Sequence, residues 1–117
     1  MTSSNDFVQY GLMALVAAVV LQRVVTKAVA RRKIPGLLQG GAVIIDVRSP
    51  GEFSGGSAAD SRNIPLSDLE RGTQDLDPNR WIIVCCASGT RSGMARRWLL
   101  KHGFPNVLNG GSWRNLP

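Results

Sequence analysis

The only two cysteines of this 117-residue chain are neighbours, Cys85 and Cys86. Adjacent cysteines cannot staple distant parts of a chain, and they lack the spacing of metal ligands, so we expect neither a disulfide framework nor a metal centre. Cys86 ends the apolar run WIIVCC, directly before a polar loop and a segment with helical periodicity. In an open parallel sheet, ligands bind beyond the carboxyl ends of the strands. The position of Cys86 therefore predicts a reactive thiol.

The loop after Cys86 consists of small and polar residues, so its backbone N–H groups can turn inward around an anion on the sulfur. A helix expected to begin near Ser92 adds the positive end of its dipole, and Arg91 adds a full charge; both favour thiolate over thiol. A thiolate can attack a sulfane sulfur and become a persulfide, whose terminal sulfur the same amides would stabilise. We predict Cys86 as the nucleophile. The predicted substrate-binding loop comprises Ala87, Ser88, Gly89, Thr90 and Arg91.

Simple core packing is the alternative role for a cysteine at a strand end, because free cysteine is among the most buried residue types. The coincidence of Cys86 with a glycine, an arginine and a helix start favours catalysis. Side chains alternate along a strand, so Cys85 is expected to face the other way and to pack, with a strained vicinal disulfide left open. His102, late in the predicted helix, is interpreted as a partner of the helix dipole and not as a base.

Strands and helices that could hold this loop alternate along the rest of the chain. The run AVIIDVR, after two glycines, is typical of a strand covered on both faces. Shorter strands are expected at 62–65 and 106–109, and a surface loop over 55–61. Short helices are expected near 36–39, after Ser49, and over 66–70, where Ser67 or its predecessor would form the cap.

The longest helix of this part is predicted between Ser92 and Phe104, with Gly103 suited to its end. Its apolar residues at helical spacing are Met94, Ala95, Trp98 and Leu99. Strands that alternate with helices indicate an α/β domain with a mainly parallel central sheet flanked by helices.

An apolar run of nineteen residues, 7–25, precedes this domain and would extend about 28 Å as a helix, close to the thickness of a bilayer core. The five basic residues of the first 33 lie at or after its C-terminal end, which places the following domain in the cytoplasm and is unlike a cleaved signal peptide. We expect residues 1–33 to be a single-pass membrane anchor with a basic flank, and residues 34–117 to be one domain. An amphipathic or buried helix packed on that domain is the alternative.

The net charge of +6 is concentrated in that first segment, which holds five basic residues against one acidic residue. Residues 34–117 hold nine basic against seven acidic residues, so the predicted domain is only mildly basic. No run of interleaved basic and aromatic residues is present, and we do not expect nucleic-acid binding.

Four segments in order, AVIIDVRSPGEF, NIPL, IVCCASGTRS and the Gly110–Gly111 ending, resemble the rhodanese homology domain. The resemblance implies a rhodanese-like fold, a persulfide on Cys86 and a pocket lined by residues 87–91. It further implies transfer of sulfane sulfur from thiosulfate or a persulfide to cyanide or a thiol, with a protein as a further acceptor class and no cofactor. Phosphatases and arsenate reductases that share the fold have one more residue between cysteine and arginine, which disfavours those activities here.

Three charged residues, Asp46, Arg48 and Glu52, also match family positions, and we interpret them as a network that fixes a strand to a helix. The resemblance fails over residues 56–61, where the family usually carries Gly-His-Ile-Pro-Gly-Ala and this chain reads GSAADS. This departure leaves open a second hypothesis, a membrane-tethered module that binds a partner or carries sulfur without turning over small donors.

Overall fold

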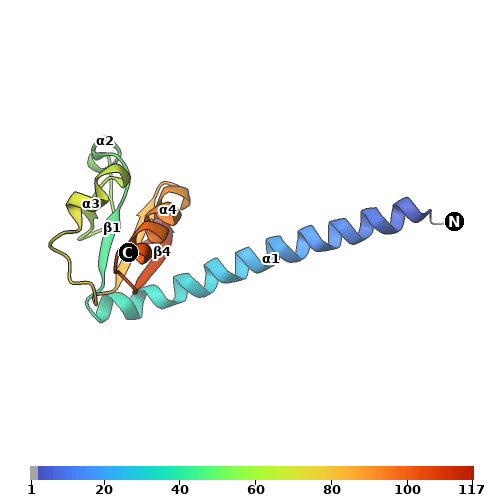
Figure 1. Cartoon of the computed structure of the whole chain (residues 1–117), viewed down its shortest axis with the longest axis horizontal. Helices are drawn as coiled ribbons and strands as arrows, with labels where there is room; N and C mark the ends of the chain where they lie inside the picture. The colour runs from blue at the N-terminus through green and yellow to red at the C-terminus, as the bar shows by residue number, and fades with distance from the viewer. Residues whose placement is uncertain (1–2) are drawn as a thin grey trace. The chain divides into compact units, whose positions relative to one another are not determined.

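The computed structural model describes residues 3–117, which divide after Arg32 into two compact units. Helix α1 (Ser4–Gln39) contains all of the described part of the first unit except Ser3 and continues into the second (Figure 1). No residue of α1 before Ile34 is buried. The prediction of a separate short helix at 36–39 is wrong, because α1 runs through Pro35 without a break.

Two glycines end α1. The Gly41 amide donates to the Leu38 carbonyl at 3.1 Å and the Ala42 amide donates to the Leu37 carbonyl at 2.9 Å, a pattern that satisfies the last carbonyls of a helix. Gly41 adopts φ of +92°, which other residues rarely do. The helix therefore ends at Gln39. Its last turns belong to the second unit, where Ile34 is buried in an apolar cluster.

Four parallel strands form the sheet of the second unit in the order β2-β1-β3-β4. Their bounds are Val43–Asp46 for β1, Arg62–Asn63 for β2, Ile82–Cys86 for β3 and Val107–Ser112 for β4. The predicted α/β fold with a mainly parallel sheet is confirmed. Because the strands are parallel, the carboxyl ends of β1, β3 and β4 lie at one edge of the sheet, where Asp46 pairs with Cys85 and Cys86 pairs with Ser112.

Apolar side chains cover the sheet on both faces. On one face, Val84 and Cys86 pack with Leu99 of α4 (Thr90–Lys101) and Leu69 of α3 (Leu69–Gly72). On the other face, Cys85 belongs to a cluster that contains the last turns of α1 and residues of the 3₁₀ helix η2 (Trp113–Asn115) and its C-terminal neighbour. The central strand β3 is buried throughout, as its continuous apolar sequence predicts.

Short helical turns connect the strands. Helix α2 (Pro50–Ser54) begins with a capping box, in which the Ser49 hydroxyl accepts from the Glu52 amide and the Glu52 carboxylate accepts from the Ser49 amide. The segment 66–70 forms the 3₁₀ helix η1 (Leu66–Asp68) followed by α3. Pro65 precedes η1 without a side-chain hydrogen bond, and Ser67 lies inside it, so Ser67 is not a cap.

Candidate active site

Cys86 is the last residue of β3, and its side chain lies on the face of the sheet that α4 covers. Only 1% of the residue is exposed. Cys85 lies on the opposite face, where burial raises the pKa of its thiol to about 12. The two adjacent sulfurs therefore have separate environments, and Cys85 stays a neutral, packed thiol at physiological pH.

Hydrogen bonds to the sulfur lower the pKa of Cys86. Burial alone would raise this pKa, but donors from the Ser92 side chain and from the loop backbone outweigh it. The contributing amides belong to Ser92, Ser88 and Gly89, and the Gly89 nitrogen lies 2.9 Å from the Cys86 Sγ. The site therefore favours the nucleophilic thiolate.

Gly89 gives the loop its turn. It caps the N-terminus of α4 with φ of +99°, a left-handed conformation that favours glycine, and a Cβ at this position would lie 3.3 Å from Gly111 Cα. This turn aims the Gly89 amide at the sulfur. The helix begins at Thr90, two residues before the expected start, and the Ser92 amide in its first turn also contributes to the sulfur.

The remaining loop residues form its outer surface. Ala87, Ser88 and Thr90 are exposed, and the hydroxyls of Ser88 and Thr90 lie 3.5 Å apart. Of these three residues, Ser88 contributes to the sulfur, and it does so through its backbone amide.

The Arg91 guanidinium forms an ion pair across the site with the Glu52 carboxylate. Its two terminal nitrogens donate to the two Glu52 oxygens at 2.7 and 3.0 Å, a bidentate geometry. The sequence suggested that Arg91 is an isolated charge beside the thiolate. In the structure, Arg91 is instead paired with Glu52. The pair instead ties the start of α4 to the capped start of α2.

We predict that the stabilising effect of this pair disappears in acid. The Arg91 guanidinium, followed by the Ser49 amide, lowers the pKa of Glu52 from 4.5 to about 2. A lowered pKa in the folded state contributes stability above the unfolded-state pKa, and this contribution is lost as pH falls through the folded-state value. The urea midpoints of the native chain and Glu52→Gln should differ at pH 6 and converge between about pH 4.5 and pH 2. A constant difference over that range would contradict the pair's role.

Asp46 and Arg48 form a second, buried ion pair at the end of β1. The Asp46 carboxylate accepts from the Arg48 Nε and Nη2 at 2.9 and 2.7 Å, and both residues are almost fully buried. The Arg48 guanidinium also donates to the backbone carbonyls of Glu52 and Gly56, and it lies 4.6 Å from the centre of the Trp113 ring. The three charged residues thus join two networks, because the Glu52 side chain bonds Arg91 while only its backbone bonds Arg48.

The segment 56–61 that departs from the family pattern is held by this second network. Gly56 has φ of +147° and packs its Cα side against Trp113, where a Cβ would lie 3.0 Å from the indole. Ala58 is buried in the cluster below the sheet, so the segment is only partly a surface loop. Small residues here leave room for Trp113 beside Arg48.

Two residues that contact the site were not predicted as members of it. The Ser92 hydroxyl lies 3.4 Å from the Cys86 sulfur, and the serine in the CCASGTRS segment was the available signal. Asn109 on β4 bonds Ser92 and Gly89, a contact that no local pattern reveals because it depends on strand pairing.

His102 lies at the end of α4, where its Nδ1 is 2.7 Å from the Trp98 carbonyl and its ring stacks on Trp98.

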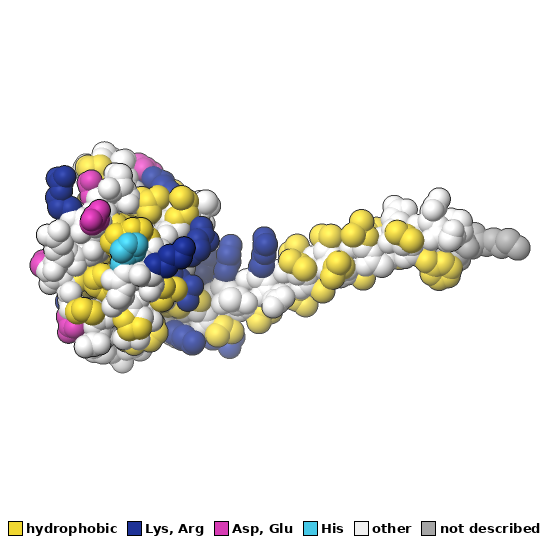
Figure 2. Space-filling model, viewed as in Figure 1, with side chains coloured by type: hydrophobic (Ala, Val, Ile, Leu, Met, Phe, Trp, Pro, Cys, Tyr) yellow, Lys and Arg dark blue, Asp and Glu magenta, His cyan; other side chains and the backbone are white. Residues whose placement is uncertain are grey.

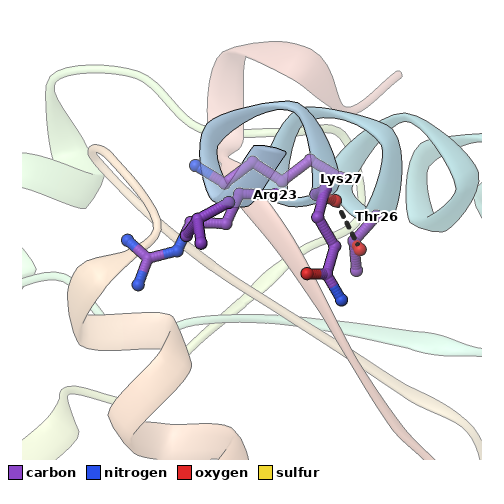
Figure 3. Close-up of a pocket in the computed structure, with 5 residues that line it drawn as sticks. Arg23, Thr26 and Lys27 are labelled. Atoms are coloured by element: carbon purple, nitrogen blue, oxygen red, sulfur yellow. Dashed lines mark hydrogen bonds between the residues drawn. The ribbon is translucent and has the colours of Figure 1, made fainter. Parts of the chain in front are cut away.

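One hollow in the described surface lacks this chemistry. A groove along one side of α1 is lined by Val19, Gln22, Arg23, Thr26 and Lys27 (Figure 3). All five lie on one helix, and the Thr26 hydroxyl donates to the Gln22 carbonyl at 2.8 Å, so the groove is an open surface between side chains (Figure 3).

Within residues 3–117, no cluster of three or more histidine, cysteine or acidic side chains could hold a metal ion.

Comparisons with known proteins agree on the fold. A family model described as the rhodanese-like domain matches residues 32–113. The thiosulfate sulfurtransferase GlpE of Stutzerimonas stutzeri is 35% identical over 79 residues, 64% of this chain and 72% of GlpE. Among solved structures, a rhodanese with anions from E. coli matches with a TM-score of 0.60 and 30% identity, over 66% of this chain and 95% of that chain.

Two relatives from Bacillus subtilis are longer than the matched region. The uncharacterized protein YqhL is 38% identical over 68 residues, 58% of this chain and 54% of YqhL. The putative sulfur carrier protein YrkF is 38% identical over 66 residues, 56% of this chain and 36% of YrkF. The chain therefore spans about half of the first relative and about a third of the second.

Proposed function

The chain belongs to the rhodanese-like domain family, and from this premise we propose that it is a sulfurtransferase whose persulfide forms on Cys86. One observation carries the proposal: the Cys86 sulfur ends the central strand inside a turn of amides, with the Gly89 nitrogen at 2.9 Å. The same turn of amides can stabilise a negative charge on the thiolate or, one bond farther out, on the terminal sulfur of a persulfide.

The proposed reaction has two displacement steps. The Cys86 thiolate attacks the outer sulfur of thiosulfate; a new S–S bond forms, the old one breaks, and its electron pair leaves with sulfite. Cyanide or a thiolate then attacks the terminal sulfur of the persulfide, and Cys86 leaves as the thiolate. Charge balances in both steps, and neither needs a metal or an organic cofactor.

We expect the full chain, reduced and incubated with thiosulfate, to gain the mass of one sulfur. The increment should be about 32 Da on the Cys86 peptide, and a thiol wash should remove it, because a persulfide is reducible. Intact-mass spectrometry before and after the wash measures both. An unmodified mass at every thiosulfate concentration would contradict the use of this donor.

A sulfur carrier or binding module is the second candidate, supported by the similarity to YrkF and by the altered 56–61 segment. A carrier would accept sulfur from a persulfidated protein and not from thiosulfate. Incubation with a persulfidated donor protein therefore separates the two: labelling of Cys86 by that donor alone favours the carrier.

Residues 1–33 are proposed as a membrane anchor, with residues 34–117 as the catalytic domain in the cytoplasm. Within the described chain, α1 is the one helix long and apolar enough to cross a membrane, and none of its apolar window is buried. Hydrophobic side chains cover much of its visible surface (Figure 2). Arg23 and Lys27 extend from its surface at the end of the apolar run, where charged ends reach lipid headgroups (Figure 3).

A charge at the centre of the apolar run should remove the protein from membranes. Val16 is the middle residue of 7–25 and more than half exposed, and arginine there costs about 2.5 to 3.5 kcal/mol of insertion free energy. Val16→Arg should lose most of the carbonate-resistant membrane fraction, measured by sedimentation and immunoblotting. Gln22→Arg, beside the basic flank, is the matched control and should remain in the pellet. Equal sedimentation of both variants would contradict a spanning helix.

A further inference from the structure

Asn109 connects three separate parts of the site through its side-chain amide. Its Oδ1 accepts from the Ser92 hydroxyl at 2.7 Å and from the Gly111 amide at 3.0 Å. Its Nδ2 donates to the Gly89 carbonyl at 3.1 Å. One side chain thus holds the first turn of α4, the cap of that helix and the end of β4 together.

Strand pairing places Asn109 opposite Val84, whose side chain lies on the face that α4 covers, and a bulge follows directly. Asn109 pairs with Val84, but the next residue of β3, Cys85, pairs with Gly111, so Gly110 is the extra residue of β4. A Cβ at Gly110 would lie 2.9 Å from the Ile83 side chain, which explains glycine at the bulge. Gly93 of α4 leaves room for the Asn109 amide, since a Cβ there would lie 3.4 Å from Nδ2.

Ser92 has a single hydroxyl proton and two neighbours that could receive it. Its oxygen lies 2.7 Å from Asn109 Oδ1 and 3.4 Å from Cys86 Sγ. While the sulfur carries its own proton, S–H can donate to the Ser92 oxygen and the hydroxyl can donate to Asn109. A thiolate has no proton to donate, so the hydroxyl must turn to the sulfur to stabilise its charge.

We propose that Asn109 is a positioning residue that holds the Ser92 proton while Cys86 is uncharged and releases it to the sulfur when the thiolate forms. The proton lost from the thiol goes to water or buffer, and no other bond changes. After the release, Asn109 Oδ1 still accepts from the Gly111 amide and is not left without a partner. When Sγ loses its charge in the persulfide, the hydroxyl returns to Asn109. This role rests on Cys86 as the proposed nucleophile.

The charged groups around the sulfur do not compete with this arrangement. Asp46 at the end of β1 and Arg48 just after it form one ion pair, and Glu52 on α2 and Arg91 on α4 form another. Cys85, the neighbour on β3, ionises only at high pH. Strand β4 carries no ionisable side chain. The variants below leave all of these groups in place.

The test is the pH dependence of Cys86 alkylation by iodoacetamide in the full chain, in four forms: native, Ser92→Ala, Asn109→Leu and the double variant. Ser92→Ala should raise the midpoint by about one pH unit, because the thiolate loses a donor. Asn109→Leu should lower the midpoint more in the native background than in the Ser92→Ala background, because only the Ser92 hydroxyl can turn fully to the sulfur when its competing acceptor is lost. Equal shifts in both backgrounds would overturn the proposal.

Asn109→Asp is the second variant, should leucine not be tolerated at this position. Its carboxylate binds the Ser92 proton more strongly, so the midpoint should rise more with Ser92 present than in the Ser92→Ala background, and equal rises would again overturn the role. Near-ultraviolet circular dichroism establishes that each variant is folded. Because alkylation needs no sulfur donor, this result is independent of whether thiosulfate forms the persulfide, and the proposed function can fail while the role of Asn109 holds.

Discussion

Cys86→Ser is expected to abolish sulfur transfer from thiosulfate, with a loss of about 10³-fold or more in turnover. A serine hydroxyl remains protonated at neutral pH, and the amides that stabilise the thiolate cannot make it a comparable nucleophile. The backbone amides around this position, including that of Gly89, should keep their positions because the substitution changes one buried atom. Formation of thiocyanate from thiosulfate and cyanide measures the loss, and the mass increment of one sulfur should vanish with it.

Cys85→Ala is the matched control for this substitution. It removes the adjacent sulfur, which lies on the opposite face of the sheet in an apolar cluster. We expect a stability cost of about 1 kcal/mol from the small cavity, with turnover within about threefold of the native chain. If Cys86→Ser retained turnover, or if Cys85→Ala lost it while folded, the assignment of the nucleophile would be wrong.

Asp46→Ala should produce the largest loss of stability among the charged residues of the second unit. The substitution leaves the Arg48 guanidinium buried without its counter-ion, and breaking a buried pair from one side costs about 3 to 5 kcal/mol. The guanidinium would keep only its bonds to backbone carbonyls and its contact with Trp113. Urea unfolding followed by tryptophan fluorescence reports on this unit, because all three tryptophans lie in it.

Asp75→Ala supplies the comparison for that loss. Asp75 pairs with Arg62 at 3.3 Å, but both side chains are largely exposed, at 69% and 46%, so its removal should cost less than about 1 kcal/mol. A small effect of Asp46→Ala, similar to that of Asp75→Ala, would show that water reaches Arg48 and that the pair does not fix the end of β1.

Local sequence predicted most elements of the second unit, although not the continuation of α1 through Pro35. The continuous apolar runs that became β1 and β3 left no exposed face, which requires cover on both sides and favours a parallel sheet. Glycines that must adopt positive φ marked real boundaries, at Gly41 after α1 and at Gly103 after α4. The alternation of residues along β3 predicted that Cys85 and Cys86 face opposite sides, and the structure confirms this.

Helical spacing was less informative about burial. In α4, Ala95 and Leu99 are buried as the pattern predicts, but Met94 is 47% exposed and the polar Ser92 is fully buried. An apolar pattern identifies which face of a helix is buried. It does not identify the outermost buried residues of that face, because these depend on the shape of the surface against which the helix packs. Ser92 can be buried because Asn109 and Cys86 satisfy its hydroxyl.

The amino-acid sequence by itself determined the position of the proposed nucleophile and the kind of loop that follows it, since a strand end, small residues and a helix start are local features. Only the tertiary structure decided which groups meet at that loop. Arg91 pairs with Glu52, 39 positions away, and Asn109 reaches Ser92 across 17 positions because β4 pairs with β3 in a register that places Asn109 opposite Val84. Such contacts depend on strand register and on the packing of α2 and α4, because a hydrogen bond needs its atoms within about 3 Å, a condition that no sequence spacing imposes between separate elements.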